Sequence, residues 1–300
     1  MQPLLDRVGR GERLVGDGAL GTMLLAAGLP PGEAPERWTL EQPDILGGIA
    51  REYRDAGADL LTTNTFGASP LRLRMHGLEN EAAALNTRAA EIAREAAAGR
   101  AYVSGSVGPT GLLLAPLGDA DPLEVADGFY RQIAALAAGG ADAICIETMS
   151  DLEEASLAVR AARRAAPLLP ILATMTFDVT PRGIFTVMGV TVQAACTRLA
   201  AEGAQLLGAN CGAGADAMRV VAEAFAGCSP LPLVFQPNAG LPQRQEGRLV
   251  YPQSPVAFAA ETAPLARYAA IVGGCCGTTP AHIAALRQHI GAKNWLNPES

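Results

Sequence analysis

Eight short apolar runs recur along this chain and constrain its fold more than any other feature of the sequence. They start roughly 28 to 45 residues apart, which is the spacing of units that each contain one strand and one helix. Runs that are nearly continuous, rather than alternating with polar residues, indicate parallel strands covered on both faces. The eight runs are residues 13–16, 58–63, 101–105, 141–146, 171–175, 204–208, 232–236 and 269–273.

Helix-forming stretches separate these runs. Residues 79–98 are rich in Ala, Glu, Leu and Arg, which favour helices. Residues 151–166 begin with acidic side chains and end with basic ones, a polarity that complements the helix dipole. The pattern predicts an α/β fold, a single (β/α)8 TIM barrel over residues 1–300 without an internal linker. A doubly wound open sheet is disfavoured because no Gly-x-Gly-x-x-Gly follows the first run.

The composition limits where such a protein works and what it binds. Hydrophobic residues make up 49% of the chain and charged residues 18%, as expected for a well-buried core. The formal net charge of −7 argues against nucleic acid or an anionic membrane as the main partner. The first residues lack the apolar segment of a secretory signal, and no apolar stretch reaches the ~20 residues that span a bilayer. We therefore expect a cytoplasmic protein.

In a reducing cytoplasm, the six cysteines are not expected to form a disulfide framework. Cys145, Cys196 and Cys228 each stand alone in the sequence. We expect these three to be small hydrophobic residues that are buried or partly buried.

Two adjacent cysteines in the segment Gly273-Gly274-Cys275-Cys276-Gly277 are hard to explain by packing alone. A disulfide between neighbours needs a strained ring, whereas two neighbouring thiolates on a glycine-rich loop can bind one soft metal ion. Cys211 has a similar setting at the end of another apolar run. Three thiolates with one open position describe a catalytic zinc site, so we predict Cys211, Cys275 and Cys276 as zinc ligands. The alternative is that these thiols are simply buried under a glycine-rich turn.

Other polar residues follow the runs at the ends that carry the chemistry in barrel enzymes. The candidates for substrate binding are Asp17, Gly18, Ala19, Asn64, Thr65, Glu147 and Asn238. Glu147 follows a mainly apolar segment, so its buried acid needs a partner, and an ion pair with an arginine is the alternative to a substrate group. Asp17 could instead cap the following helix. The two asparagines and Thr65 could instead form hydrogen bonds with loop backbone.

Zinc held by three thiolates is electron-rich, and a fourth thiol binds such an ion as a thiolate that stays nucleophilic. The natural reaction is therefore alkyl transfer to a substrate sulfur. If the thiol belongs to an amino acid, Glu147 and Asp17 could bind its ammonium, and the backbone N–H groups of Gly18 and Ala19 could bind its carboxylate. A histidine-rich zinc would favour water activation, but none of the three histidines adjoins the cysteines.

Several of these segments together resemble the homocysteine S-methyltransferase family, and the match runs roughly from residue 14 to residue 289. The segments that carry the resemblance are residues 17–22, 63–67, 146–148, 208–212 and 273–278. The resemblance implies a zinc-dependent (β/α)8 barrel that makes methionine from homocysteine.

The resemblance also implies individual roles. It places zinc on Cys211, Cys275 and Cys276. It assigns the amino-acid part of homocysteine to Asp17, Glu147 and the loop around Thr65. It further suggests that Asn238 can occupy the open metal position before the substrate arrives.

The methyl donor is the least constrained part of this interpretation. Residues 237–242 look like the methionine synthase version of the family, whereas residues 32–38 also resemble bacterial betaine-type enzymes. Betaine recognition needs an aromatic cage, and only Phe66 and Trp38 are candidates for one. The sparse cage favours methylcobalamin as the donor. Because the chain given stops at Ser300, we expect a separate corrinoid protein or further methionine synthase modules to carry it.

Two alternatives stay open. Betaine or S-methylmethionine could be the donor to homocysteine. A protein of another class, a non-catalytic zinc-binding or redox-sensing barrel, would not need the acidic residues Asp17 and Glu147 beside its metal.

Overall fold

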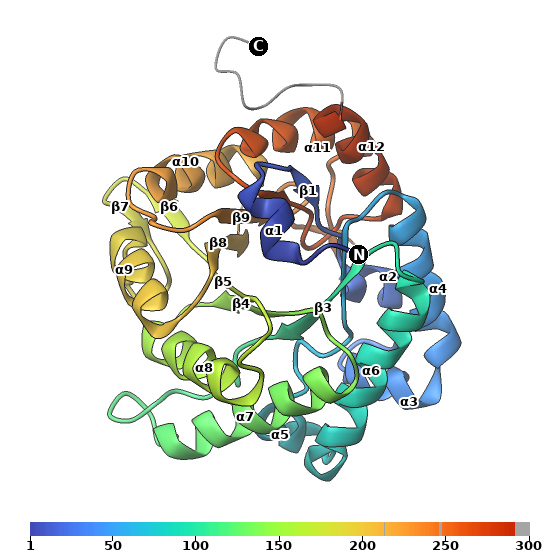
Figure 1. Cartoon of the computed structure of the whole chain (residues 1–300), viewed down its shortest axis with the longest axis vertical. Helices are drawn as coiled ribbons and strands as arrows, with labels where there is room; N and C mark the ends of the chain where they lie inside the picture. The colour runs from blue at the N-terminus through green and yellow to red at the C-terminus, as the bar shows by residue number, and fades with distance from the viewer. Residues whose placement is uncertain (213, 246–247, 292–300) are drawn as a thin grey trace.

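A computed structural model describes residues 1–212, 214–245 and 248–291, and the other residues of the predicted domain 1–300 lie outside the described residues. Eight parallel strands form its central sheet, which confirms the predicted (β/α)8 TIM barrel (Figure 1). Each strand overlaps one of the eight apolar runs. The strands are β1 (Leu14–Val15), β2 (Leu60–Thr62), β3 (Tyr102–Val107), β4 (Ala143–Met149), β5 (Ile171–Met175), β8 (Leu206–Cys211), β9 (Leu233–Pro237) and β12 (Ile271–Val272).

Hydrogen bonds join the two ends of the sheet. β1 pairs with β12 on one side, and on the other side Gly16, directly after β1, forms a parallel bridge with Leu60 of β2. The N–H of Asp59 donates to the carbonyl of Val15 over 2.7 Å, and Asp59 Oδ2 accepts from the N–H of Val15 over 2.9 Å. The carboxyl ends of all eight strands therefore surround a single rim.

Helix α1 (Leu4–Gly9) lies across the middle of the barrel in Figure 1 and covers its amino-terminal end. Leu4 and Val8 are buried in one cluster with interior residues of the strands, among them Leu14 and Leu60. Because apolar side chains fill this end of the barrel, a polar substrate has to bind at the opposite end.

Helices surround the sheet (Figure 1). The predicted helix at residues 79–98 is a 3-10 turn, η3 (Glu79–Glu81), followed by α6 (Ala82–Ala97), and the one at 151–166 is α8 (Leu152–Ala165). The remaining helices are α2 (Leu20–Ala26), α3 (Trp38–Glu41), α4 (Pro43–Asp55), α5 (Pro70–Leu73), α7 (Pro122–Ala138), α9 (Val192–Glu202), α10 (Ala215–Ala226), α11 (Pro255–Thr262) and α12 (Pro280–Gly291), with 3-10 turns η1 (Pro35–Arg37), η2 (Arg74–His76) and η4 (Ala263–Arg267). In the part of the chain that the structure describes, no helix is long and apolar enough to cross a membrane.

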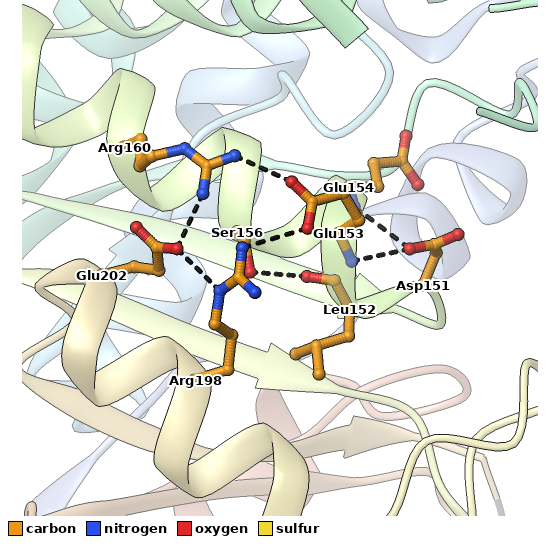
Figure 2. Close-up of polar contacts among 8 residues, drawn as sticks. All are labelled: Asp151, Leu152, Glu153, Glu154, Ser156, Arg160, Arg198 and Glu202. Carbon is orange, nitrogen blue, oxygen red and sulfur yellow. Dashed lines mark hydrogen bonds and ion pairs between the residues drawn. The ribbon is translucent and has the colours of Figure 1, made fainter. Parts of the chain in front are cut away.

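A network of charged side chains joins α8 to α9 on the outside of the barrel (Figure 2). Arg160 bridges Glu153 at 2.9 Å and Glu202 at 2.7 Å, and Arg198 bridges the same two carboxylates at 3.0 and 2.7 Å. Asp151 caps α8 by accepting hydrogen bonds from the first backbone N–H groups of the helix. Exposed ion pairs of this kind contribute about 0–1 kcal/mol each, so the network fixes how the helices meet more than it stabilises the fold.

Two short hairpins were not predicted from the sequence. One follows β5 and consists of β6 (Asp178–Thr180) and β7 (Gly183–Phe185). The other follows β9 and consists of β10 (Gln243–Gln245) and β11 (Arg248–Val250). Both lie after the carboxyl end of a barrel strand, and so they add to the walls around the rim.

The isolated cysteines are packed as predicted. Cys145 and Cys196 are buried, and Cys228 is partly buried with its sulfur 3.1 Å from that of Cys196. Trp38 at the start of α3 is also buried in the main hydrophobic core.

Candidate metal centre and substrate site

Three cysteine sulfurs meet at the carboxyl end of the barrel. Cys211 is the last residue of β8, and Cys275 and Cys276 follow β12, with β9 between these two strands. All three sulfur atoms lie within 4.8 Å of one another, and those of Cys211 and Cys276 are 3.9 Å apart. The strands thus bring together the three residues that the sequence predicted as a metal site.

Backbone hydrogen bonds hold the Cys275-Cys276 loop in place. The N–H of Cys275 donates to the carbonyl of Pro237 over 2.8 Å, and the carbonyl of Cys276 accepts from the N–H of Ala239 over 2.9 Å. The hydroxyl of Thr278 donates to the carbonyl of Cys275 over 2.7 Å. Gly277 has a φ of +82°, and a Cβ atom there would lie 2.2 Å from Tyr251, so glycine is required at this turn.

The backbone is strained near the ends of β4 and β8, the two strands that flank β5. Cys211 has a φ of +62° and Thr148, directly after Glu147, has a φ of +59°. A left-handed conformation in a residue other than glycine costs on the order of 1–3 kcal/mol and concentrates at functional sites. The two strained residues lie where the backbone directs the Cys211 sulfur and the Glu147 carboxylate to the same rim of the barrel.

The donor set fits a zinc ion. Sulfurs bound to a tetrahedral zinc at ~2.3 Å lie about 3.8 Å apart, close to the spacing observed here. Hydrogen bonds from the Cys275 and Cys276 thiols lower the pKa of Cys211 to about 3, and sharing these protons raises the pKa of Cys275 and of Cys276. A metal ion can take the place of the shared protons.

Asn238 supplies a further donor next to the cysteines. Its amide nitrogen donates to the carbonyl of Gly212 over 2.6 Å, while its Oδ1 atom is buried without a hydrogen-bond partner. The Asn238 side chain also hydrogen-bonds Cys211, and its unpaired oxygen can still accept a donor or a cation, because buried polar atoms are almost always paired.

Two carboxylates lie at the same end of the barrel, Asp17 buried after β1 and Glu147 partly buried on β4. Glu147, on β4, accepts a 2.5 Å hydrogen bond from the hydroxyl of Ser106. Asp17 accepts hydrogen bonds from the N–H and the hydroxyl of Thr62 at 2.6 and 2.7 Å. Both acids line a cavity of about 20 Å³ inside the barrel, together with Gln236.

These two acids have no cationic partner. Burial raises the pKa of Asp17 and of Glu147 to about 7, from 3.8 and 4.5, and each acid has a further negative group nearby. Among the described residues, neither forms an ion pair, which removes the internal arginine pair considered as an alternative for Glu147. Buried carboxylates without a cation favour a positively charged ligand.

The side chains of two other predicted residues, Asn64 and Thr65, form hydrogen bonds with other segments of the chain. Thr65 is fully buried and donates to the carbonyl of Ser106, and Asn64 donates to the carbonyl of Pro35 and the hydroxyl of Thr39. These side-chain contacts match the loop hydrogen bonds considered as an alternative.

The turn after β1 is engaged in the same way. The N–H of Ala19 donates to the hydroxyl of Thr278 over 3.0 Å, so this amide is not free for a substrate carboxylate in the structure. A Cβ atom at Gly18 would lie 2.5 Å from the same hydroxyl. This turn therefore locks the first loop onto the cysteine loop.

Sequence reasoning missed three residues of the site. Asn210 hydrogen-bonds Glu147 and Cys275, Ser106 hydrogen-bonds Glu147, and Tyr251 packs over Gly277. Burial and the neighbouring Cys276 raise the pKa of Tyr251. The position of Asn210 directly before a predicted ligand was a signal that could have identified it.

Comparison with known proteins identifies the family. The family model described as homocysteine S-methyltransferase matches residues 14–290. This chain belongs to the homocysteine S-methyltransferase family. Methionine synthase of Mycobacterium tuberculosis is 34% identical over 288 residues, covering 90% of this chain and 24% of that protein. Methionine synthase of Mycobacterium leprae is 33% identical over 299 residues, with 94% and 24% covered. The chain thus spans about a quarter of the length of these relatives.

Solved structures agree with this family assignment. The metallated homocysteine methyltransferase MmuM of Escherichia coli has a TM-score of 0.79 and 26% identity, covering 96% of this chain and 99% of that one. The oxidized form of the same protein has a TM-score of 0.74 and 27% identity, with 96% and 98% covered.

We predict that the double substitution Cys275→Ser/Cys276→Ser lowers the zinc content of the purified protein from about one ion per chain to near zero, because hydroxyls do not replace thiolates as zinc ligands. Elemental analysis after dialysis measures this. Cys228→Ser, which changes a cysteine outside the cluster, is the control and should keep its zinc. Full zinc retention in the double variant would contradict the assignment.

A second prediction concerns stability and pH in the metal-free protein. Asp17 has a pKa of about 7 when folded and 3.8 as its ordinary value, so its contribution to stability is present at low pH and is lost as pH rises to about 7. Between pH 5 and pH 8 this loss amounts to roughly 2–3 kcal/mol. Urea unfolding should therefore show that the free energy of unfolding of Asp17→Asn, relative to that of the native protein, increases from pH 5 to pH 8. A pH-independent difference between the two would contradict the burial of an uncompensated acid.

Proposed function

We propose that this protein is a zinc-dependent homocysteine S-methyltransferase that makes methionine. The observation that carries the proposal is the meeting of a three-sulfur cluster with two carboxylates, Asp17 buried and Glu147 partly buried, that lack a cation among the described residues. The amide nitrogen of Asn210 lies 3.4 Å from Glu147 Oε2 and 3.8 Å from Cys275 Sγ, so these two atoms lie within about 7 Å of each other. An amino acid with a terminal thiol has a cation and a sulfur that can reach both.

Different residues bind the two ends of the substrate, the ammonium and the sulfur. Glu147 and Asp17 bind the ammonium, which supplies the positive charge that their buried carboxylates need. Cys211, Cys275 and Cys276 would hold zinc, with Oδ1 of Asn238 available to it before substrate arrives. Zinc bound there would keep the substrate sulfur as a nucleophilic thiolate near neutral pH.

The loop residues have a supporting role in this proposal. Asn64 and Thr65 shape the wall beside Glu147 through their contacts with backbone. The amides of Gly18 and Ala19 lie in the turn that Thr278 holds, so the substrate carboxylate would need another donor or a shift of that turn.

We propose methylcobalamin as the donor, carried by a separate corrinoid protein or by further modules such as those of the longer methionine synthases. Exposed apolar side chains on the loops after β3, β5 and β9 support a large partner at this rim. They include Leu112, Leu113, Leu117, Val187, Met188 and Leu241. Their removal from water would favour docking of a corrinoid carrier.

Betaine is less well supported as the donor. A cage for its quaternary ammonium needs two or more aromatic rings, but Trp38 is buried in the core and Phe66 is partly exposed on the rim. S-Methylmethionine stays an alternative donor to homocysteine. The free cysteines of the cluster are consistent with a reducing compartment, and we propose the cytoplasm as the location.

We predict that Glu147→Gln weakens homocysteine binding by about tenfold to a hundredfold, because a charge-assisted hydrogen bond to the ammonium contributes roughly 1.5–3 kcal/mol. Calorimetric titration of the zinc-loaded protein measures this, and zinc content should not change. Glu154→Gln is a control, since Glu154 is a buried glutamate that accepts its hydrogen bonds from Thr110. Equal homocysteine affinity in Glu147→Gln and the native protein would contradict the assignment.

The donor prediction is tested by methyl transfer to homocysteine with methylcobalamin, betaine and S-methylmethionine supplied in parallel. We expect kcat/KM for methylcobalamin to exceed that for betaine by at least about tenfold, because the aromatic cage that betaine needs is incomplete. A tenfold advantage of betaine would overturn this donor assignment without affecting the role of the cysteines.

A further inference from the structure

Asn210 is a buried side chain with hydrogen bonds to three other strand ends, those of β4, β5 and β12. It lies on β8 directly before Cys211 and is 1% exposed. Its Oδ1 atom accepts from the N–H of Thr148 and from the hydroxyl of Thr174, both over 2.8 Å. A backbone N–H can only donate, so this contact fixes which end of the amide is the oxygen.

The amide nitrogen of Asn210 therefore faces three acceptors. It donates to the hydroxyl of Thr148 over 2.7 Å, and it lies 3.4 Å from Glu147 Oε2 and 3.8 Å from Cys275 Sγ. One of its two N–H groups is taken by Thr148, and the other is directed between the carboxylate and the sulfur.

The local shape of β4 serves this arrangement. The pairing of β4 with β5 shifts register between Ile146 and Met149, and Thr148 takes a left-handed conformation within that interval. The irregularity breaks the usual alternation of side chains, so Glu147 and Thr148 both reach Asn210. The left-handed backbone of Thr148 thus goes together with its two hydrogen bonds to the side-chain amide of Asn210.

We propose that Asn210 is a positioning residue that sets the separation between the ammonium site at Glu147 and the metal site at Cys275. This inference rests on the proposed function. A fixed separation selects the number of methylene groups between the amine and the sulfur of the substrate. Asn210 thereby helps the site prefer homocysteine, with two such groups before the α-carbon, over cysteine, with one.

Asn210→Asp tests the inference with little change in shape. The substitution keeps an oxygen for Thr148 and Thr174 but places an acceptor, instead of a donor, against the carboxylate of Glu147 and the sulfur of Cys275. The two ends of the site lose their common hydrogen-bond donor, and the new charge repels both of them.

The measurement uses the cobalt(II)-substituted protein, in which thiolate binding to the metal is followed by its absorption band. Titrations with L-homocysteine, L-cysteine and 1-propanethiol separate the two ends, since 1-propanethiol has no ammonium. Ser156→Ala is the control, because it removes a buried hydrogen bond to Leu152 on the outer helix α8, away from the site (Figure 2).

We expect Asn210→Asp to retain about one metal ion per chain and to bind 1-propanethiol within about threefold of the native protein, whereas homocysteine affinity falls about tenfold or more and the preference for homocysteine over cysteine shrinks. Ser156→Ala should change none of these values. An unchanged preference in Asn210→Asp would overturn the inference.

Two further outcomes are informative. If Asn210→Asp does not fold, Thr174→Val loosens the same amide by removing one donor to its oxygen, and an unchanged preference in that variant would equally overturn the inference. Failure of the native protein to bind homocysteine more tightly than 1-propanethiol would overturn the proposed function, and this inference with it.

Discussion

The clustering of three cysteine sulfurs at the end of the barrel is the constraint on which the rest of the site depends. Thiolates at this spacing repel one another unless protons or a metal ion lie between them. The fold supplies the rigidity that keeps them together, through the left-handed backbone of Cys211 and the glycine turn after Cys276. A barrel with a filled amino-terminal end leaves this rim as the place where such chemistry can occur.

Charge balance connects the cluster with its surroundings. Asp17 is buried and Glu147 partly buried, both without a cation among the described residues, and thiolates of the cluster would add further negative charge. In the proposed function, a zinc ion and the substrate ammonium would supply the two cations. Asn210, which is neutral and donates hydrogen bonds, lies between the two positions. The same electrostatic argument therefore accounts for the metal, for the amino-acid substrate and for the polar residue between them.

The sequence predicted the eight strands because parallel strands buried on both faces are continuous apolar segments, and it predicted the metal cluster because adjacent cysteines have few structural uses. It could not predict which polar side chains point into the site. Asn64 and Thr65 follow β2 at the same end of the barrel, yet they hydrogen-bond the backbone of Pro35 and Ser106, which lie far away in the sequence. The role of Asn210 depends on partners in three other strand ends, and the amide of Ala19 is taken by Thr278 from the opposite end of the chain. Such contacts exist only after the barrel has closed.

Zinc K-edge X-ray absorption with and without homocysteine is the most direct measurement of the central claim, that the cysteine cluster binds a metal which takes up the substrate sulfur. The account predicts three sulfurs at ~2.3 Å and one lighter ligand in the free protein, and four sulfurs after homocysteine is added. A first shell dominated by nitrogen, or a spectrum that homocysteine does not change, would contradict it.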